Sequence, residues 1–436
     1  MKIKETLLNW IKFLYEKFFG MEFTDEIRTL INNIYYVFIG TTFSSIFLFI
    51  IHVYGGRVVG PEQYGLFNLM VSISLFLAIP TTLGMEIATQ KYLPSNRDVK
   101  ERKKIISSSY FIIFILLIIL LPVYLLISAY VSSPIRISIE LFYLAIIFSI
   151  LYTLYKTSTG IMRGLLSMKR YSIFEILSSF IAFILFFYLI SICMERGFSA
   201  LYLPFGIKYL VVFFLVLLYV KHYLSSKIDF SWSKKLVHYG SIAAIGDVAW
   251  VLVGNIDRIM INMFLDTSSV GIYQAYYFAS TVPIGAIWGV FRFVLFPTFS
   301  KFEDKKSILF RIEKLIPLCF LILLILTPIV TFIILCLYGT SYKIDFLLII
   351  LFTFFTAIAH ISAMYSWLLN SIGVGGVKVV TMSTYLLAGV NIILNLILIP
   401  NIGLFGAVMA SVISKSAVLV YYLYTIYLKK SFTELV

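Results

Sequence analysis

Apolar segments long enough to cross a lipid bilayer recur along the whole chain, and this feature restricts its fold more than any other. A helix needs about 20 mostly apolar residues to cross the bilayer core. The sequence predicts twelve such spans, near residues 33–53, 66–87, 105–131, 137–160, 171–194, 199–220, 241–264, 270–298, 315–337, 345–370, 377–399 and 403–428. The segments show no apolar–polar alternation, which favours helices over a transmembrane β-barrel. We therefore expect an all-α integral membrane protein.

The composition excludes a soluble fold. Only 13% of the 436 residues are charged and 61% are apolar, whereas an ordinary soluble domain carries about 25% charged residues. The three cysteines lie inside apolar segments and form no CxxC pair (Cys193, Cys319 and Cys336). We therefore expect neither a metal site nor a disulfide framework, and no cofactor. Charges interrupt the start of the chain throughout, so it does not resemble a secretory signal.

The distribution of Lys and Arg predicts the orientation. Most of the 35 cationic residues lie in the N-terminal segment, in the connectors after even-numbered spans and in the C-terminal tail. The connectors after spans 1, 3, 5 and 9 carry one each, namely Arg57, Arg136, Arg196 and Lys343. Because cytoplasmic connectors are enriched in Lys and Arg, both termini are predicted to be cytoplasmic. The net charge of +14 is thus explained by topology and indicates no nucleic-acid partner.

The chain divides into an N-terminal segment and two halves. Residues 1–32 begin with apolar side chains at helical spacing among lysines, which predicts an amphipathic helix on the inner leaflet. A helix packed on the cytoplasmic end of the bundle is the alternative. Residues 33–230 and 231–436 each supply six spans, and we expect them to form two lobes. Transporters built from such repeats bind their substrate between the halves.

The two halves begin alike. The connector after the first span closes on Gly65 and the connector after the seventh closes on Gly271, each followed by an apolar and an aromatic residue. Each connector then leads into a span that contains a proline, Pro80 or Pro283. Glycine permits a tight turn, and proline removes one helical hydrogen bond and kinks the helix. We expect these four residues to act as hinges when the lobes move.

Three segments carry a resemblance to a known family. Residues 60–67 read GPEQYGLF, residues 255–261 read NIDRIMI before VGIY at 270–273, and residues 391–400 read NIILNLILIP before GLFGA at 403–407. These segments resemble signatures of polysaccharide-unit flippases, which belong to the multidrug/oligosaccharidyl-lipid/polysaccharide exporter superfamily. Their order, on spans 1–2, 7–8 and 11–12, extends the resemblance over essentially the whole chain.

The resemblance implies a fold and an activity. The fold would be two six-helix lobes arranged as a V in the cell membrane. The activity would be movement of a lipid-linked oligosaccharide from the inner to the outer leaflet by alternating access, with no chemical reaction catalysed. The implied partners are that substrate, membrane lipids and the polysaccharide assembly machinery.

Cationic residues inside spans are the candidate substrate ligands. An ionisable group costs about 2.5–3.5 kcal/mol at the bilayer centre, so each one suggests a functional role. Lys208 and Lys415 lie near mid-depth in the sixth span of each half, and Arg258 lies in the seventh. Arg292 and Arg57, nearer span ends, complete the set of cations proposed to bind a substrate phosphate. The alternatives are a helix-packing ion pair for each lysine and snorkelling to the interface for Arg292.

The seventh span is the most polar. Asp247 and Arg258 are separated by three helical turns and share one face, and such a seam cannot face lipid. The candidates for this seam or for a coupling ion are Asp247, Asn255, Asp257, Asn262 and Glu86. Either a proton or a sodium ion would suit these groups. The alternative is that Asp257 and Arg258 pair and only fix the local packing.

Two other functions fit such a chain less well. A multi-span glycosyltransferase would need an acidic metal-binding motif on an outer loop, and the outer loops here are short with few acids. A drug exporter of the same superfamily would share the fold but would be expected to favour buried acids, which suit organic cations. The mid-depth cations instead favour an anionic substrate.

Overall fold

A computed structural model describes residues 25–427, except 97, 226 and 302–304, and describes side chains within 35–289 and 305–427 with the same gaps. The described chain is entirely helical and contains no strand. The elements are α2 (Asp25–Thr82), α3 (Met85–Ser95), α4 (Val99–Ser132), α5 (Ile139–Gly164), α6 (Met168–Ser191), α7 (Ser199–Val220), the 3₁₀ turn η1 (Lys221–Tyr223), α8 (Phe230–Phe264), α9 (Thr267–Lys301), α10 (Lys305–Tyr338), α11 (Phe346–Ile372), α12 (Val374–Ile402) and α13 (Leu404–Tyr427). The amphipathic segment expected at the N-terminus lies outside the described residues.

The helices account for the twelve expected spans. Ten helical segments of the described chain are long and apolar enough to cross a membrane. One of them lies in α2, whose 58 residues would extend roughly 87 Å at 1.5 Å per residue. Two bilayer crossings therefore fit in α2, separated at Gly60, where the backbone adopts φ 79°. The eighth expected span lies in α9, so the all-α membrane fold is confirmed.

Several boundaries differ from the expected ones. The connector expected between spans 1 and 2 is helical on both sides of Gly60. The α8 helix begins at Phe230 rather than near 241, because its first turns are polar and an apolar window does not detect them. The helix is not interrupted at Pro80 but three residues later, at Leu83 and Gly84, which both have positive φ. The α9 helix continues through Pro283.

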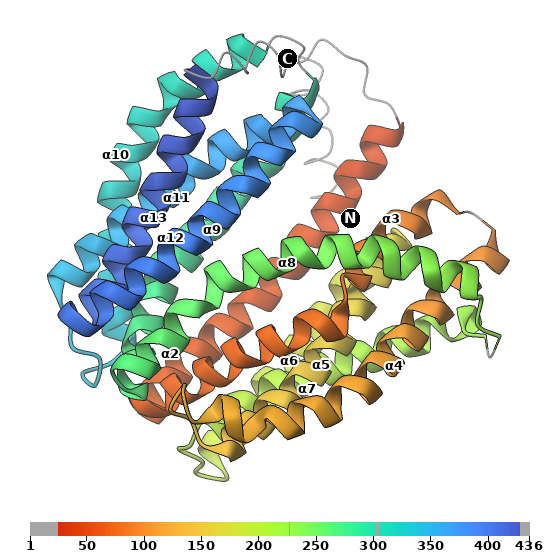
Figure 1. Cartoon of the computed structure of the whole chain (residues 1–436), viewed down its shortest axis with the longest axis horizontal. Coiled ribbons are helices and arrows are strands. Elements are labelled where there is room, and N and C mark those ends of the chain that lie inside the picture. Colours follow the sequence, from red (N-terminus) through yellow and green to blue (C-terminus); the bar gives the residue numbers. More distant parts are fainter. Residues whose placement is uncertain (1–24, 97, 226, 302–304, 428–436) are drawn as a thin grey trace, which may run out of the picture.

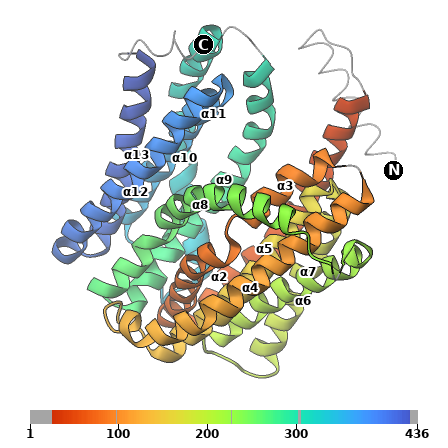
Figure 2. The same ribbon diagram turned by 45° about the vertical axis from the view of Figure 1, so that its right-hand side comes forward.

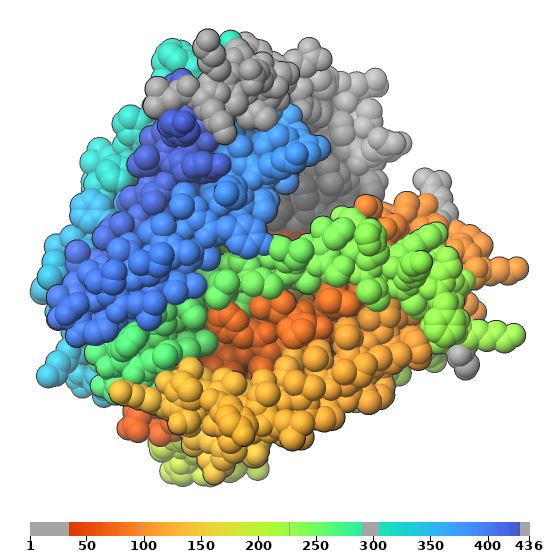
Figure 3. All heavy atoms as spheres, viewed as in Figure 1, coloured from red at the N-terminus to blue at the C-terminus, as the bar shows by residue number. Residues whose placement is uncertain are grey.

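Figures 1 and 2 show α10–α13 grouped on one side of the molecule and α4–α7 on the other. The α8 helix runs from one group to the other, and Figure 3 shows it between them on the surface. At its start, the Trp232 indole donates a 2.6 Å hydrogen bond to Glu101 of α4. Nearer its end, Asp257 accepts a 2.6 Å hydrogen bond from Asn395 of α12. This helix is therefore held by both groups.

The α2 and α9 helices approach each other closely where they cross. A Cβ atom on Gly65 would lie 1.9 Å from the carbonyl oxygen of Thr267, and one on Gly271 would lie 1.9 Å from that of Pro61. Only glycine allows backbones to approach this closely. The contact lies at the end of the bundle that the charge distribution predicts to face outside.

Candidate functional site

A cavity of about 360 Å³ lies among α8, α9, α11, α12 and α13. We call it the C-lobe cavity. Its volume lies within the range of about 300–1,000 Å³ usual for small-molecule sites. Its lining combines apolar and ionisable side chains, among them Trp250, Asp257, Arg258, Tyr277, Phe355, His360, Asn391, Ser411 and Lys415.

Arg258 has neutral partners only. Its Nε donates a 2.6 Å hydrogen bond to Oε1 of Gln274, and its Nη1 donates to the carbonyl oxygen of Gly254. The guanidinium lies 4.9 Å from the centre of the Tyr277 ring. Within the described part of the chain no carboxylate forms an ion pair with it, so a buried positive charge is presented to the cavity.

Lys415 of α13 contributes a second cation to the same cavity. No ion pair joins its ammonium group to any described carboxylate. His360 lines the cavity beside it, within electrostatic range, and its Nδ1 donates a 2.7 Å hydrogen bond to the carbonyl oxygen of Thr356. The structure thus brings together Arg258 and Lys415 of the predicted cationic set.

Asp257 does not pair with Arg258, its neighbour in the sequence. Its carboxylate accepts hydrogen bonds from the Tyr273 hydroxyl at 2.7 Å, the Asn395 amide at 2.6 Å and the Ser411 hydroxyl at 3.0 Å. The side chain is buried, and all of these partners are neutral. The alternative in which Asp257 and Arg258 pair is therefore wrong.

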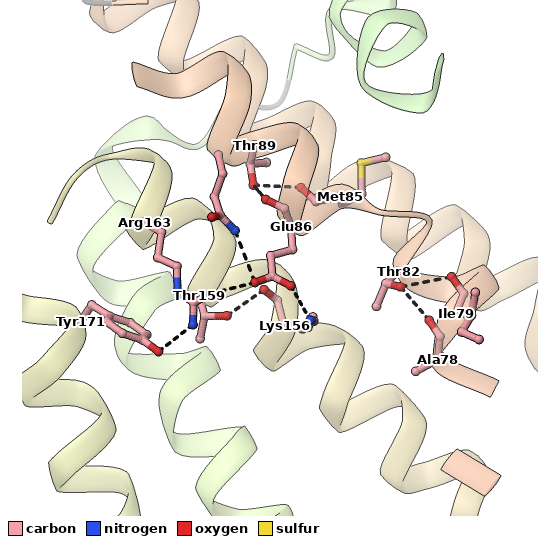
Figure 4. A network of polar contacts seen from close by, with 11 residues as sticks. Ala78, Ile79, Thr82, Met85, Glu86, Thr89, Lys156, Thr159, Arg163 and Tyr171 are labelled. Atoms are coloured by element: carbon pink, nitrogen blue, oxygen red, sulfur yellow. Dashed lines mark hydrogen bonds and ion pairs between the residues drawn. The ribbon is translucent and has the colours of Figure 1, made fainter. Parts of the chain in front are cut away.

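A second cluster lies on the α3, α5 side, and Figure 4 shows it. Glu86 accepts contacts from Lys156 Nζ at 2.6 Å and Arg163 Nη1 at 3.0 Å. The Gln90 amide adds a 3.3 Å hydrogen bond. Asp247 of α8 lies within electrostatic range of Lys156 and Glu86. Glu86 and Asp247, predicted for the polar seam or a coupling ion, thus lie near each other, and within the described residues neither shares a hydrogen-bond or ion-pair partner with Asp257.

Lys156 and Arg163 are not among the site residues predicted from the sequence. Both lie at the end of the fourth span, where cations usually reach the interface. The signal was their separation of seven residues, which puts both on one face of α5. Their side chains are 32% and 38% exposed, so this pair of cations is partly accessible while it holds the buried Glu86.

Lys208 is not available to a substrate. Its ammonium forms a 3.0 Å ion pair with Glu175, and the two side chains are only 6% and 5% exposed. The Tyr155 hydroxyl donates a 2.7 Å hydrogen bond to the same carboxylate. The helix-packing ion pair, which was the alternative for this lysine, is the arrangement found. Lys208 and Lys415 share a depth but not an environment.

The remaining candidates are dispersed. Asn262 donates to the carbonyl oxygens of Ile135 and Arg136, at 2.7 and 3.1 Å, and so joins α8 to the α4–α5 loop. Asn255 donates to a carbonyl oxygen of its own helix. Arg57 lines a separate pocket beside the α10–α11 loop, and the side chain of Arg292 lies outside the described ones.

A groove of about 500 Å³ separates the first half of α2 from α9. We call it the α2–α9 groove. Small and apolar side chains dominate its lining, which comprises Phe38, Thr41, Thr42, Ser45, Ile46, Phe49, Val282, Pro283, Gly285, Ala286, Gly289 and Ile334. Gly285 lines both the groove and the C-lobe cavity. A polar compartment and an apolar groove therefore adjoin at the same glycine of α9.

Comparison with known proteins places the chain in a family. The family model described as "Polysaccharide biosynthesis protein" matches residues 30–303. The chain belongs to this family. No curated protein matches it at a significant level.

Solved structures share the fold of this polysaccharide biosynthesis protein. An inward-facing multidrug resistance MATE family transporter of the MOP superfamily is 14% identical with a TM-score of 0.66, over 92% of this chain and 98% of that one. An outward-facing one is 15% identical with a TM-score of 0.54, over 93% and 96%. The lipid II flippase MurJ, in an inward closed conformation, is 16% identical with a TM-score of 0.61, over 91% and 89%. The protein is thus a multi-pass membrane protein with a transporter fold.

Proposed function

We propose that this protein moves a lipid-linked oligosaccharide, attached through phosphate or diphosphate, from the inner to the outer leaflet. The observation that carries the proposal is the C-lobe cavity, where Arg258 and Lys415 face the space and neither forms an ion pair with a carboxylate of the described residues. A polar glycan and a phosphate cannot enter hydrocarbon unaided, because unpaired polar groups are costly there. Membership of the polysaccharide biosynthesis family supports the same substrate class.

The cavity cations would bind the phosphate of the substrate. Arginine offers a planar set of donors that matches phosphate oxygens, and lysine offers a compact charge. Gln274 and Gly254 occupy two of the Arg258 donors and fix its orientation. The remaining donors are free to meet an anion without reorganisation of the side chain. Arg258 would thus position the phosphate, and Lys415 would add charge.

The α2–α9 groove would accommodate the lipid part of the substrate. The groove is apolar and lies beside the cavity, with Gly285 common to both linings. A long prenyl or acyl chain could remain in contact with lipid while the phosphate and the glycan occupy the polar compartment. Small residues such as Gly289 and Ala286 leave room for this chain.

Transport would proceed by alternating access. The Gly65–Gly271 contact closes the end predicted to be outside, and the Tyr64 and Tyr338 hydroxyls meet there at 3.1 Å. Substrate would enter from the cytoplasmic side and leave after these contacts separate. Assembly machinery for the glycan would receive the product on the outer side.

A coupling cation would bind at Asp257. No cation of the described residues forms an ion pair with this buried carboxylate, and the oxygen atoms of Tyr273 and Ser411 lie within 3.0 Å of it. Asn395 Oδ1 is buried without a hydrogen-bond partner, which supplies an unused acceptor. Oxygen donors of this kind suit a hard cation, and protonation of the carboxylate would serve the same purpose.

The C-lobe cavity also bears on the alternative of a multidrug exporter. A site for organic cations would need an accessible acid that dominates its charge. Here Asp257 is engaged by three hydrogen bonds while two cations face the space. The anionic substrate is therefore the better match.

Replacement of Arg258 by Ala tests the phosphate role. Loss of a charged hydrogen bond is worth about 1.5–3 kcal/mol, so export should fall roughly 10- to 100-fold. The assay is surface glycan, with accumulation of the lipid-linked glycan on the cytoplasmic side, in a host that lacks the native gene. Arg258→Lys should restore export in part, because the charge remains and the planar donor set is lost.

The matched control is Arg196→Ala, since Arg196 is an exposed cation on the α6–α7 loop. It should export normally, and membrane levels of all variants should be equal. Normal export by the Arg258→Ala protein would contradict the phosphate role.

Replacement of Asp257 by Asn tests the coupling role separately. Asn keeps the shape of the side chain but removes the negative charge. Transport into vesicles should then lose its dependence on a sodium gradient or on a proton gradient, whichever drives the parent protein. Unchanged gradient dependence at a normal protein level would assign Asp257 to packing alone.

A further inference from the structure

A second pocket lies beside the contact between Tyr64 and Tyr338, since Tyr338 is among the residues that line it. It has a volume of about 620 Å³ and is formed by the end of α10, the α10–α11 loop and one residue of α2. Its lining is Arg57, Leu335, Cys336, Tyr338, Gly339, Thr340, Ser341, Tyr342, Lys343 and Ile344. We call it the outer pocket, since the charge distribution predicts this end to face outside.

The outer pocket is positively charged. Arg57 and Lys343 supply two cations from opposite lobes, and Thr340 and Ser341 supply hydroxyl groups. None of the described residues that line it is acidic. Neither cation forms an ion pair with a carboxylate in the described part of the chain. Two cations, exposed hydroxyls and no counter-charge together match a phosphate-bearing anion.

The surroundings place the pocket at a lipid interface. Leu337 lies between lining residues and is 49% exposed, and Phe346 and Leu347 follow the pocket and are 68% and 54% exposed. The helices that carry these residues, α10 and α11, are long and apolar enough to cross a membrane. Lys and Arg beside such a boundary lie at the depth of lipid headgroups. The pocket therefore opens where lipid phosphates are concentrated.

Residues of both lobes form the pocket. The Tyr342 hydroxyl donates a 2.9 Å hydrogen bond to the carbonyl oxygen of Gly56, the neighbour of Arg57. The backbone turn at Gly339 has φ +89°, and an added Cβ there would lie 3.4 Å from Cγ and Nε of Arg57. Arg57 is thus packed against a turn of the other lobe. Separation of the lobes at this end would remove one of the two cations.

We propose that the outer pocket binds a phosphate-bearing anion and thereby stabilises the conformation that is closed on this side. A ligand shifts a conformational equilibrium only through its different affinity for the two states. An anion bound by both Arg57 and Lys343 would have a higher affinity for the closed state, because the two cations are separated in the open state. The anion is either the headgroup of an outer-leaflet lipid or a free phosphate compound. Its role is to return the empty transporter to the state that accepts substrate.

The experiment measures the distance between the lobes at this end. Spin labels would be attached to cysteines at Ser133, in the α4–α5 loop, and Asn401, at the end of α12; both residues are exposed. The native cysteines (Cys193, Cys319 and Cys336) would be replaced by Ser. The protein would be studied in nanodiscs of phosphatidylcholine alone, of phosphatidylcholine with added inorganic diphosphate, and of a mixture with phosphatidylglycerol.

We expect one of the two anions to raise the fraction of molecules with a short distance between the two spin labels about two-fold or more. A response to diphosphate in neutral lipid assigns a soluble phosphate compound, and a response to phosphatidylglycerol alone assigns a lipid headgroup. The Arg57→Gln/Lys343→Gln protein should lose the response. Arg196→Gln, which removes an exposed cation of the same end outside the pocket, should keep it.

Two results would overturn the proposal: no response to either anion, or a response that persists in the double variant. The second would mean a general effect of surface charge. Size-exclusion profiles would verify that each variant is folded. The test uses no transported substrate, so its failure leaves the transport proposal standing, and the Arg258→Ala assay tests that proposal by itself.

Discussion

The ion pair between Lys208 and Glu175 gives the sharpest test of the assignments, because it separates a packing role from a transport role. The two side chains are 6% and 5% exposed, and their charged atoms are 3.0 Å apart. Lys208→Met removes one charge and leaves Glu175 buried with the Tyr155 hydrogen bond as its remaining support. Breaking a buried pair in this way costs about 3–5 kcal/mol.

The cost should largely disappear when both charges are removed. In the Lys208→Met/Glu175→Gln protein, Tyr155 can still donate to the amide oxygen, and no uncompensated charge remains. Replacement of a buried pair by neutral groups of similar volume is close to neutral for stability. The double variant should therefore regain most of the stability that the single variant loses.

The assay is the melting temperature of the purified protein in detergent, together with export measured per molecule of folded protein. The single variant should melt at a clearly lower temperature and export normally per folded molecule. The double variant should match the parent in both measurements. A single variant of normal stability that does not export would refute this reasoning and return Lys208 to the substrate site.

Two further predictions concern the ends of the bundle. Gly271→Ala should slow transport and open the outer end to thiol reagents, because the added Cβ would lie 1.9 Å from the Pro61 oxygen; Gly246→Ala, which meets open space, is the control. The pKa of Asp229 is lowered from its usual value of 3.8 mainly because the Trp232 backbone N–H donates to it. Its contribution to the start of α8 should therefore be present at pH above about 4 and be lost as the pH falls through the lowered pKa. Trp232 fluorescence measures this. Asp229→Asn should lose the Asp229 part of the transition, since Asn caps without charge, and keep the part due to Glu101, which accepts the hydrogen bond from the Trp232 indole.

The sequence predicted the spans well because hydrophobicity over about 20 residues is a one-dimensional property. It did not predict that α8 begins at Phe230, since the polar first turns of a long helix look like a connector. It also placed a turn where α2 continues, because Gly60 and Pro61 are typical turn residues. In the structure a single positive φ at Gly60 suffices to redirect the helix.

The candidate site was predicted only in part, because a sequence does not show which way a side chain points around the axis of its helix. Depth in the membrane follows from position in a span, but the direction in which a side chain points depends on the packing of the neighbouring helices. Lys208 and Lys415 have matching depths, yet the first meets Glu175 and the second lines a cavity. The pairing of Lys208 with Glu175 depends on how α6 and α7 pack together, so it could not be foreseen from one sequence.

The polar residues of the seventh span, α8, interact with helices of both groups. Asp247 lies near Lys156 on one side, while Asp257 is bound by Asn395 on the other. A helix that is fixed to both groups of helices cannot move as a rigid part of either one. Gly254 has open space around it, and it lies between the two attachments. If the lobes rock as proposed, α8 would bend between its two attachments, and this bending would couple the charge cluster at Glu86 to the cavity at Arg258.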